Sequence, residues 1–229
     1  MTSMNSFHGL GLLLGLGLAA GSVLAEEGNI ERGKQAAAVC AACHQADGSG
    51  MEIPNGESWP RLAGLPAEYI AKQLLDCKEG WRTNTTMLPF ANMLDEQQRA
   101  DIAAYFSSLE SPQLPTAYRA ADPEDQAEWL AERGDCGNDI PACNQCHGPN
   151  GLGVGSAFPP LAGQHAGYIE AQLYAWRDGS RDNDPNGLMK GVAERLSEAQ
   201  IELIADYYAT LPERVAERGL ASGQEENEP

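Results

Sequence analysis

The chain has 229 residues, of which 42% are hydrophobic and 21% charged, a composition that fits one or two globular domains and excludes a largely disordered protein. Its 33 acidic and 15 basic side chains leave a formal net charge of −18. Such a surface repels nucleic acid and anionic lipid headgroups and attracts basic patches on partner proteins. The alternative interpretation, a solvated acidic coat, does not exclude such attraction.

The first 25 residues predict an export signal. Residues 10–20 are apolar and rich in leucine and glycine, and Val23, Leu24 and Ala25 fit the small-residue rule for cleavage before Glu26. This apolar run is shorter than the ~20 residues that a membrane span needs, and no later segment of the sequence is a better candidate. We therefore expect a periplasmic protein that is cleaved after Ala25 and has no transmembrane anchor in its mature chain.

An internal repeat occupies most of the remaining sequence. The segment 59–64 returns as 158–163, 99 positions later. Further matches at this offset are Tyr69 and Ile70 with Tyr168 and Ile169, Gln73 and Leu74 with Gln172 and Leu173, Gly80 with Gly179, and Arg82 with Arg181. Matches in this order indicate a duplicated domain. We predict domains over residues 26–112 and 126–220, a proline-rich polar linker over 113–125, and a disordered acidic tail over 221–229.

Each copy of the repeat has helical patterns, and the sequence contains no clear alternating strand pattern, so the predicted fold class is all-α. Proline is suited to the first turn of a helix, which favours one helix over residues 66–78 and an equivalent one over 166–177. Gly80 and Gly179 are suited to end these helices.

A second helix is predicted near the end of each copy. Apolar residues there follow helical spacing, namely Ile102, Phe106 and Leu109 in the first copy and Ile201, Ile204, Ala205, Tyr208 and Leu211 in the second. Asp95 is the expected N-cap of the first of these helices. Ser197 and Gln200 form a capping box at the start of the second.

Two Cys-x-x-Cys-His motifs, at 40–44 and 143–147, carry the chemistry. Two thiols three residues apart on one turn can add to the two vinyl groups at one edge of a haem, which brings the adjacent histidine under the iron. The motif is typical of c-type haem attachment, and one copy occurs in each repeat. A redox dithiol would need a βαβ context, and a zinc site would need a further Cys or His pair nearby. We predict two covalently bound haem c groups, with these attachment and ligand residues: Cys40, Cys43 and His44, and Cys143, Cys146 and His147.

The sixth ligand of each iron is expected to be a methionine, the usual partner of histidine in electron-carrying c haems. Met87 and Met189 each lie seven residues before the leucine that leads into the last predicted helix of their copy. No other methionine pair aligns, since the counterpart of Met93 is an arginine. We predict Met87 and Met189 as the second axial ligands. The alternative is that these methionines only fill the core.

Several other polar residues of the repeat have expected roles. The histidine of each motif should donate its free ring N–H to a backbone carbonyl, and the regions of Pro60 and Pro159 are candidates. The arginines at the matched positions would either pair with haem propionates or lie on the surface, and the matched tyrosines would either bond a propionate or pack. These residues are Arg82 and Arg181, and Tyr69 and Tyr168.

Cys77 and Cys136 lie outside the motifs and have no equivalents in the other copy. In an oxidising compartment a leftover pair suggests a disulfide, which would here tie the two domains together. A buried free thiol at Cys77, which sits on a predicted helix, and an axial cysteine ligand are the alternatives.

Residues 30–212 together resemble the cytochrome c4 family of dihaem periplasmic cytochromes. The resemblance rests on the two haem motifs, on the segment 158–164 and on the Asn-Asp-Pro sequence at 183–185 before Met189. It implies two tandem class I cytochrome c domains packed face to face, with His/Met irons and with propionates near the domain interface. The chain departs from the family in its cysteines at 77 and 136 and in the setting of Met87.

The resemblance also implies an electron carrier without substrate chemistry of its own. It would take electrons from a cytochrome bc complex or a dehydrogenase and deliver them to a haem–copper oxidase, either free in the periplasm or peripheral to the inner membrane, and it would dock on basic patches of these partners. A haem enzyme is the main rival, but it would need an open iron site, and two equivalent methionines argue against one. A dedicated cytochrome subunit of one dehydrogenase is a third interpretation that the sequence does not separate from a free carrier.

Overall fold

The computed structural model describes residues 27–111, 114, 125–184 and 186–225, so the predicted export signal and nearly all of the predicted linker lie outside the described residues. The first half contains α1 (Ile30–Ala36), η1 (Ala37–Val39), α2 (Ala41–His44), α3 (Ala67–Glu79), α4 (Leu88–Met93) and α5 (Glu96–Ser107). The second half contains α6 (Gln126–Arg133), η2 (Cys136–Asn138), α7 (Cys143–His147), η3 (Pro149–Gly151), α8 (Ala166–Asp178), α9 (Leu188–Arg195) and α10 (Glu198–Glu225). The only extended pairing among the described residues consists of isolated β-bridges, which confirms the all-α class.

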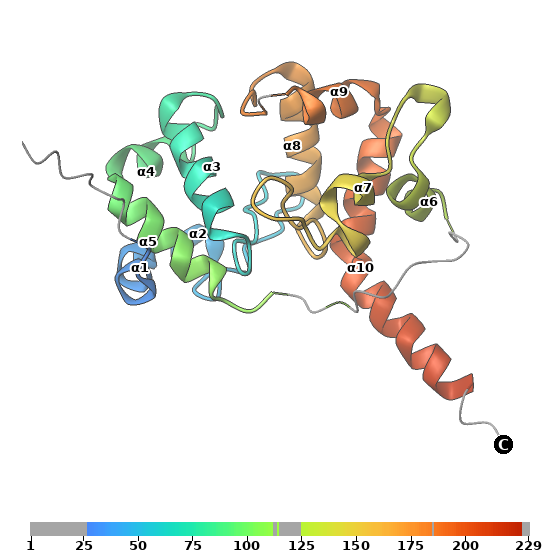
Figure 1. Ribbon diagram of the computed structural model, residues 1–229, viewed down its shortest axis with the longest axis horizontal. Coiled ribbons are helices and arrows are strands. Elements are labelled where there is room, and N and C mark those ends of the chain that lie inside the picture. The colour runs from blue at the N-terminus through green and yellow to red at the C-terminus, as the bar shows by residue number, and fades with distance from the viewer. Residues whose placement is uncertain (1–26, 112–113, 115–124, 185, 226–229) are drawn as a thin grey trace, which may run out of the picture.

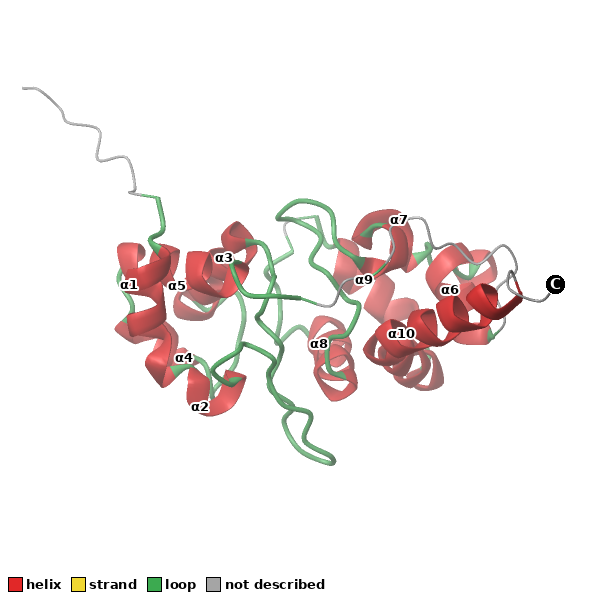
Figure 2. Ribbon diagram, turned by 90° about the horizontal axis from the view of Figure 1, so that it is seen from below, coloured by secondary structure: helices red, strands yellow, loops and turns green. Residues whose placement is uncertain are grey.

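The helices form two lobes that lie side by side, α1–α5 in one and α6–α10 in the other (Figure 1). Each lobe has its own hydrophobic core: the first contains Ala37, Leu65, Ile70, Ile102, Ala103 and Phe106, and the second, larger one includes Leu130, Ile169, Leu173, Trp176, Ile201, Ile204, Tyr207, Tyr208 and Leu211. Loops occupy much of the space between the lobes, with α3 and α8 on either side (Figure 2). The expected boundaries of the two domains stay a prediction. None of the described helices is both long and apolar enough to cross a membrane.

The first lobe depends on a close crossing of α1 and α5. A Cβ atom on Gly33 would lie 1.9 Å from the carbonyl oxygen of Asp101, so only glycine permits this approach. Asp95 caps α5 as expected and forms a reciprocal capping box with Gln98. The expected apolar stripe is confirmed, since Ile102 and Phe106 are buried in the core.

The two helices that carry most of the repeat signal, α3 and α8, lie where the sequence predicts them. α3 starts one residue after Pro66, and both helices have 13 residues. Gly80 and Gly179 follow them in the left-handed conformation, with φ of 84° and 80°. The turn therefore requires glycine in both copies, which explains why the repeat retains it.

The last helix, α10, differs from the prediction in its length. Ser197 and Gln200 form the expected capping box at its start. Pro212 lies inside the helix and has no N–H for the carbonyl oxygen of Tyr208, which instead accepts from the N–H of Gly163 at 2.7 Å. α10 then continues to Glu225, so the first part of the segment expected to be a disordered tail is helical. Extending an existing helix costs little per residue, whereas a new helix needs a costly nucleus.

Candidate functional site

The first Cys-x-x-Cys-His motif lies on the short helix α2, with Cys40 just before it, and the second motif forms the short helix α7. In each motif the histidine makes the expected hydrogen bond to a proline carbonyl. The Nδ1 atom of His44 lies 2.8 Å from the carbonyl oxygen of Pro60, and that of His147 lies 2.8 Å from that of Pro159. This bond orients each ring and leaves Nε2 with the lone pair that a metal requires.

Both motif histidines are buried, with 6% and 7% of their surface exposed. Burial lowers the pKa of His44 and of His147 below the ordinary histidine value, although the bonds to Pro60 and Pro159 act in the opposite direction. The rings are therefore neutral at neutral pH, which is the form that binds metal.

One cavity, lined mainly by the first lobe and on one side by α8 of the second, brings the predicted first site together. Cys40, Cys43, His44 and Met87 all line it, so two thiols, an imidazole and a thioether share one space. The rest of the wall is largely apolar and includes Leu62, Leu65, Ile70, Leu74, Phe90, Ile102 and Phe106. Met93 is not part of this wall, and 72% of its surface is exposed. The donor set and the apolar wall fit a covalently attached haem with a histidine–methionine iron.

The corresponding residues of the second site lie on the other lobe, where Cys146 is exposed. His147 contacts the ring of Phe158 edge-on, with 6.2 Å between the ring centroids. Cys143 and Met189 are partly buried and pack against the same hydrophobic core. The backbone N–H of Met189 donates to Asp184 Oδ2 at 2.5 Å, which orients the start of α9.

The structure does not join Cys77 to Cys136. Both are free thiols; Cys77 is buried on α3, and Cys136 is exposed on η2. Cys77 lines the first cavity. Of the sequence-based alternatives, the structure therefore favours the buried free thiol over the disulfide.

Arg82 and Arg181 face each other across the junction of the lobes, so the surface alternative for these arginines is wrong. Arg82 Nη2 donates to Gln172 Oε1 at 2.8 Å, and Arg181 Nη2 donates to Gln73 Oε1 at 3.1 Å. Each glutamine also accepts from the arginine of its own lobe. All hydrogen bonds of the two guanidiniums within the described residues go to neutral oxygens. Because buried charges are normally paired, two cations without a bonded carboxylate fit an anionic group at this place.

Tyr69 and Tyr168 have a role that the sequence-based alternatives did not include. The hydroxyl of Tyr168 accepts from Arg82 Nη2 at 2.8 Å, and that of Tyr69 accepts from Arg181 Nη2 at 3.3 Å. Each tyrosine therefore binds the arginine of the other lobe. Backbone bonds from Thr83 N–H to the Ser180 carbonyl, and from Asp182 N–H to that of Trp81, flank the arginines.

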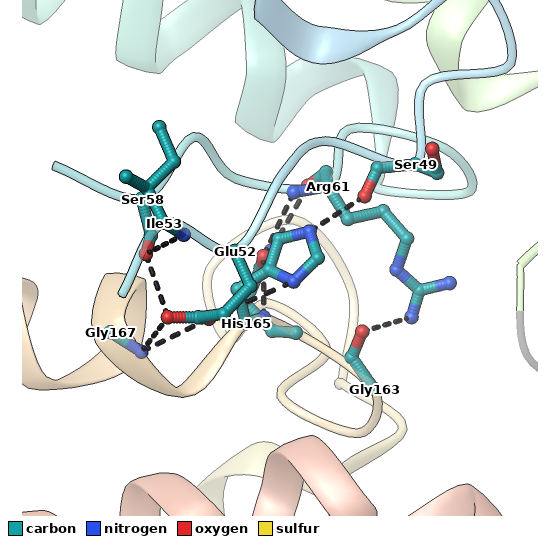
Figure 3. A network of polar contacts seen from close by, with 9 residues as sticks. Ser49, Glu52, Ile53, Ser58, Arg61, Gly163, His165 and Gly167 are labelled. Atoms are coloured by element: carbon teal, nitrogen blue, oxygen red, sulfur yellow. Dashed lines mark hydrogen bonds and ion pairs between the residues drawn. The ribbon is translucent and has the colours of Figure 1, made fainter. Parts of the chain in front are cut away.

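A second polar network joins the lobes around Arg61 and His165 (Figure 3). Arg61 Nη2 donates to the carbonyl of Gly163 at 2.9 Å, and its backbone N–H donates to Gln164 Oε1 at 2.8 Å. Burial lowers the pKa of Arg61 to about 10, so its guanidinium stays charged at neutral pH. His165 Nε2 lies 2.9 Å from the carbonyl oxygen of Ser49, so this histidine, which lies outside the two haem motifs, helps to join the lobes.

Sequence reasoning missed most residues of the interface. Gln73 and Gln172 were visible as a matched pair, but nothing in one linear sequence shows that each amide reaches across to the other copy. Arg61 and Gln164 have no matched partners in the repeat, and nothing in the sequence pairs them with each other.

Comparisons with known proteins agree with this arrangement. The cytochrome c family model matches residues 30–110 and 138–212. A thiosulfate dehydrogenase electron acceptor from Stutzerimonas stutzeri is 42% identical, over 78% of this chain and 82% of its own. Cytochrome c4 from Pseudomonas aeruginosa is 41% identical, over 86% of this chain and 94% of its own. The crystal structure of reduced recombinant cytochrome c4 from Pseudomonas stutzeri is 39% identical and superposes with a TM-score of 0.69, over 80% of this chain and 98% of its own.

Proposed function

The chain belongs to the cytochrome c family and is a dihaem electron carrier of the cytochrome c4 type, and from this premise we propose that it carries electrons in the periplasm from a dehydrogenase or a cytochrome bc complex towards a haem–copper oxidase. The protein holds two covalently bound haem c groups, one for each Cys-x-x-Cys-His motif. Export of the chain by a signal in residues 1–25 belongs to the same proposal, because covalent haem attachment and the family's periplasmic setting require it.

We assign Cys40 and Cys43 to attachment of the first haem, with His44 and Met87 as its axial ligands. The observation that carries this assignment is the single cavity that all four side chains line. When bound, the haem supplies an iron that changes by one electron between its ferric and ferrous states. A thioether ligand favours the ferrous form, so Met87 raises the potential into the range of an electron carrier.

The second site is assigned by the repeat, with Cys143, Cys146, His147 and Met189 in the same roles. The protein's own residues orient the ligands: the Pro159 carbonyl holds the imidazole, and Asp184 holds the backbone of Met189. Arg82 and Arg181 supply the positive charge against which the haem propionates would lie at the junction of the lobes. With a histidine and a methionine both bound to each iron, no coordination position would remain for a substrate.

An optical redox titration tests this function. Two haems that are both low-spin in each oxidation state and that titrate at positive or mildly negative potentials would support a carrier with two His/Met irons. Rapid carbon monoxide binding to the native reduced protein would contradict it, because that reaction needs an open position at the iron.

A second, narrower function is that of electron acceptor for a thiosulfate-oxidising dehydrogenase. The support is the relative from Stutzerimonas stutzeri, together with one from Thiomonas intermedia that has the same description and is 45% identical. Mixing the oxidised protein with a purified thiosulfate dehydrogenase and thiosulfate should reduce both haems within the turnover time of that enzyme. Reduction no faster than with thiosulfate alone would reject this partner and leave the general carrier function intact.

A further inference from the structure

Two equivalent asparagines, Asn84 and Asn183, precede the two axial methionines. They are 99 positions apart, which is the offset of the repeat. Each lies in the loop that leads to its methionine, Met87 or Met189, and each is held by an acidic side chain. The two acidic side chains come from different parts of the molecule.

The first loop is held from within its own lobe. Asn84 Oδ1 accepts from the backbone N–H of Met87 at 2.7 Å, and Asn84 Nδ2 donates to Glu57 Oε1 at 3.1 Å. The hydroxyl of Thr86 donates to the other oxygen of Glu57 at 2.8 Å. Glu57 therefore fixes the residues on the N-terminal side of Met87.

The second loop is held from the opposite lobe. Asn183 Nδ2 donates to Asp76 Oδ2 at 2.6 Å and to Gln73 Oε1 at 2.9 Å, and both acceptors lie on α3 of the first lobe. Lys72 on the same helix donates to the backbone carbonyl of Asn183 at 3.2 Å and also binds Asp76. Asp76 has only 8% of its surface exposed, so its bond to Asn183 is partly shielded from water.

The sequence of the repeat shows that this arrangement cannot be reciprocal. At the offset of 99, Lys72 corresponds to Ala171 and Asp76 to Ala175, so α8 has no equivalent of Lys72 or Asp76 to hold Asn84. Both alanines line the first cavity. In turn, Glu57 corresponds to Ser156, whose side chain is too short to repeat the contacts that Glu57 makes.

We infer that Asp76 is a positioning residue for Met189 across the domain interface: the first domain holds Asn183 of the second haem's ligand loop, while Asn84 of the first haem's loop is held within its own domain by Glu57. The inference rests on the proposed ligation of the second iron by Met189. Asn183 transmits the contact, because the adjacent Asp184 binds the backbone N–H of Met189. A change in the first domain near α3 therefore reaches the second iron through Asn183, whereas α8 offers Asn84 no equivalent carboxylate.

The test uses the holoprotein with Asp76→Ala and, as the matched change at the other loop, Glu57→Ala. Two readouts report ligation: the weak long-wavelength absorption band of the ferric iron–methionine bond, and the rate at which added imidazole displaces the methionine. The variants Met87→Ala and Met189→Ala identify the contribution of each haem. We expect Asp76→Ala to speed displacement at the second haem about tenfold and to leave the first unchanged, because it removes a shielded bond to a charged group. Glu57→Ala should affect only the first haem.

Two further variants separate positioning from general loosening of the interface. Asp76→Asn keeps an oxygen that can accept from Asn183, so it should restore most of the native displacement rate. Glu52→Gln weakens a different contact between the domains, with the backbone N–H of Gly167, and should leave both haems unchanged. If Asp76→Ala alters neither haem or both equally, or if Glu52→Gln reproduces its effect, the inference is wrong. If the band of the native protein is unchanged in Met189→Ala, the ligand assignment is wrong and the inference falls with it.

Discussion

The Nδ1 atom of His44 lies 2.8 Å from the carbonyl oxygen of Pro60, 16 residues further along the chain. This hydrogen bond fixes the orientation of the ring without any bound ligand, and it leaves Nε2 as the nitrogen with a free lone pair. His147 Nδ1 lies at the same distance, 2.8 Å, from the carbonyl oxygen of Pro159, so both copies of the domain contain this hydrogen bond. Ligand orientation in each half is therefore a property of the loop after the motif as well as of the motif itself.

The first prediction concerns haem number. Because each motif supplies its own pair of thiols, the double substitution Cys143→Ala and Cys146→Ala should leave one covalent haem, attached at Cys40 and Cys43. Mass spectrometry of the denatured chain and the absorbance of its pyridine haemochrome measure this. The unaltered protein should carry two haems, and finding one would contradict the assignment of both motifs.

The second prediction concerns the axial methionines. Met87→Ala and Met189→Ala should each remove about half of the iron–methionine absorption band, lower the potential of one haem and open that haem to carbon monoxide. Met93→Ala is the control, since 72% of Met93 is exposed and it lies outside the wall of the first cavity. Loss of the band in the Met93 variant, with retention in the Met87 variant, would show that the first ligand has been assigned incorrectly.

The third prediction concerns the two cysteines outside the motifs. In the native holoprotein an alkylating reagent should modify Cys136, which is exposed, and spare Cys77, which is buried and whose pKa is raised by that burial. After unfolding without a reductant, both should react, as mass spectrometry of tryptic peptides would show. Failure of either thiol to react until a reductant is added would mean that the two form a disulfide.

The fourth prediction concerns the buried carboxylate of Asp101. It accepts from Arg32 Nε at 2.7 Å and from the backbone N–H of Asn29 at 2.7 Å, and so ties the start of α1 to α5. The hydrogen bond from Arg32, the largest effect, lowers the pKa of Asp101 well below its ordinary value. Asp101→Asn should reduce the free energy of unfolding by about 2 kcal/mol, as expected for lost bonds to a charged group.

The pH dependence of stability gives this prediction a second measurement. A carboxyl whose pKa is depressed by folding stabilises the protein fully above its unfolded pKa of ~3.9, and this stabilisation is lost as the pH falls towards the folded value. Denaturant unfolding at pH 7 and at low pH should therefore show that the Asp101→Asn variant loses less stability on acidification than the native protein. Glu96→Gln, an exposed change on the same helix, should behave as the native protein does. If acidification lowered the free energy of unfolding of Asp101→Asn and Glu96→Gln by the same amount, the role assigned to Asp101 would be wrong.

The fifth prediction concerns encounter with redox partners. The formal charge of −18 should attract a basic partner, so the association rate should fall as salt rises and the Debye length shortens to ~8 Å at physiological ionic strength. Stopped-flow electron transfer to a basic cytochrome or copper protein at several salt concentrations measures this. A rate that does not change with salt would show that the acidic residues are only a solvated coat.

Much of the fold and of the site follows from local features of the sequence. The bounds of α3 and α8, their terminal glycines and the caps at Asp95 and Ser197 depend on residues within one or two turns of each other, so their patterns are visible in the sequence. The length of α10 was missed, because the Tyr208 carbonyl that Pro212 leaves free accepts from the N–H of Gly163, far earlier in the chain.

By itself, the sequence determined the chemistry and the duplication of this protein, since thiol spacing, a neighbouring histidine and a repeated methionine are all read along one chain. Only the tertiary structure decided what joins the two halves. Arg82 bonds Tyr168 and Gln172, and Asp76 bonds Asn183, across separations of 86 to 107 residues. Such contacts depend on how two folded surfaces meet, and the periodicity and local motifs of either half contain no information about that meeting.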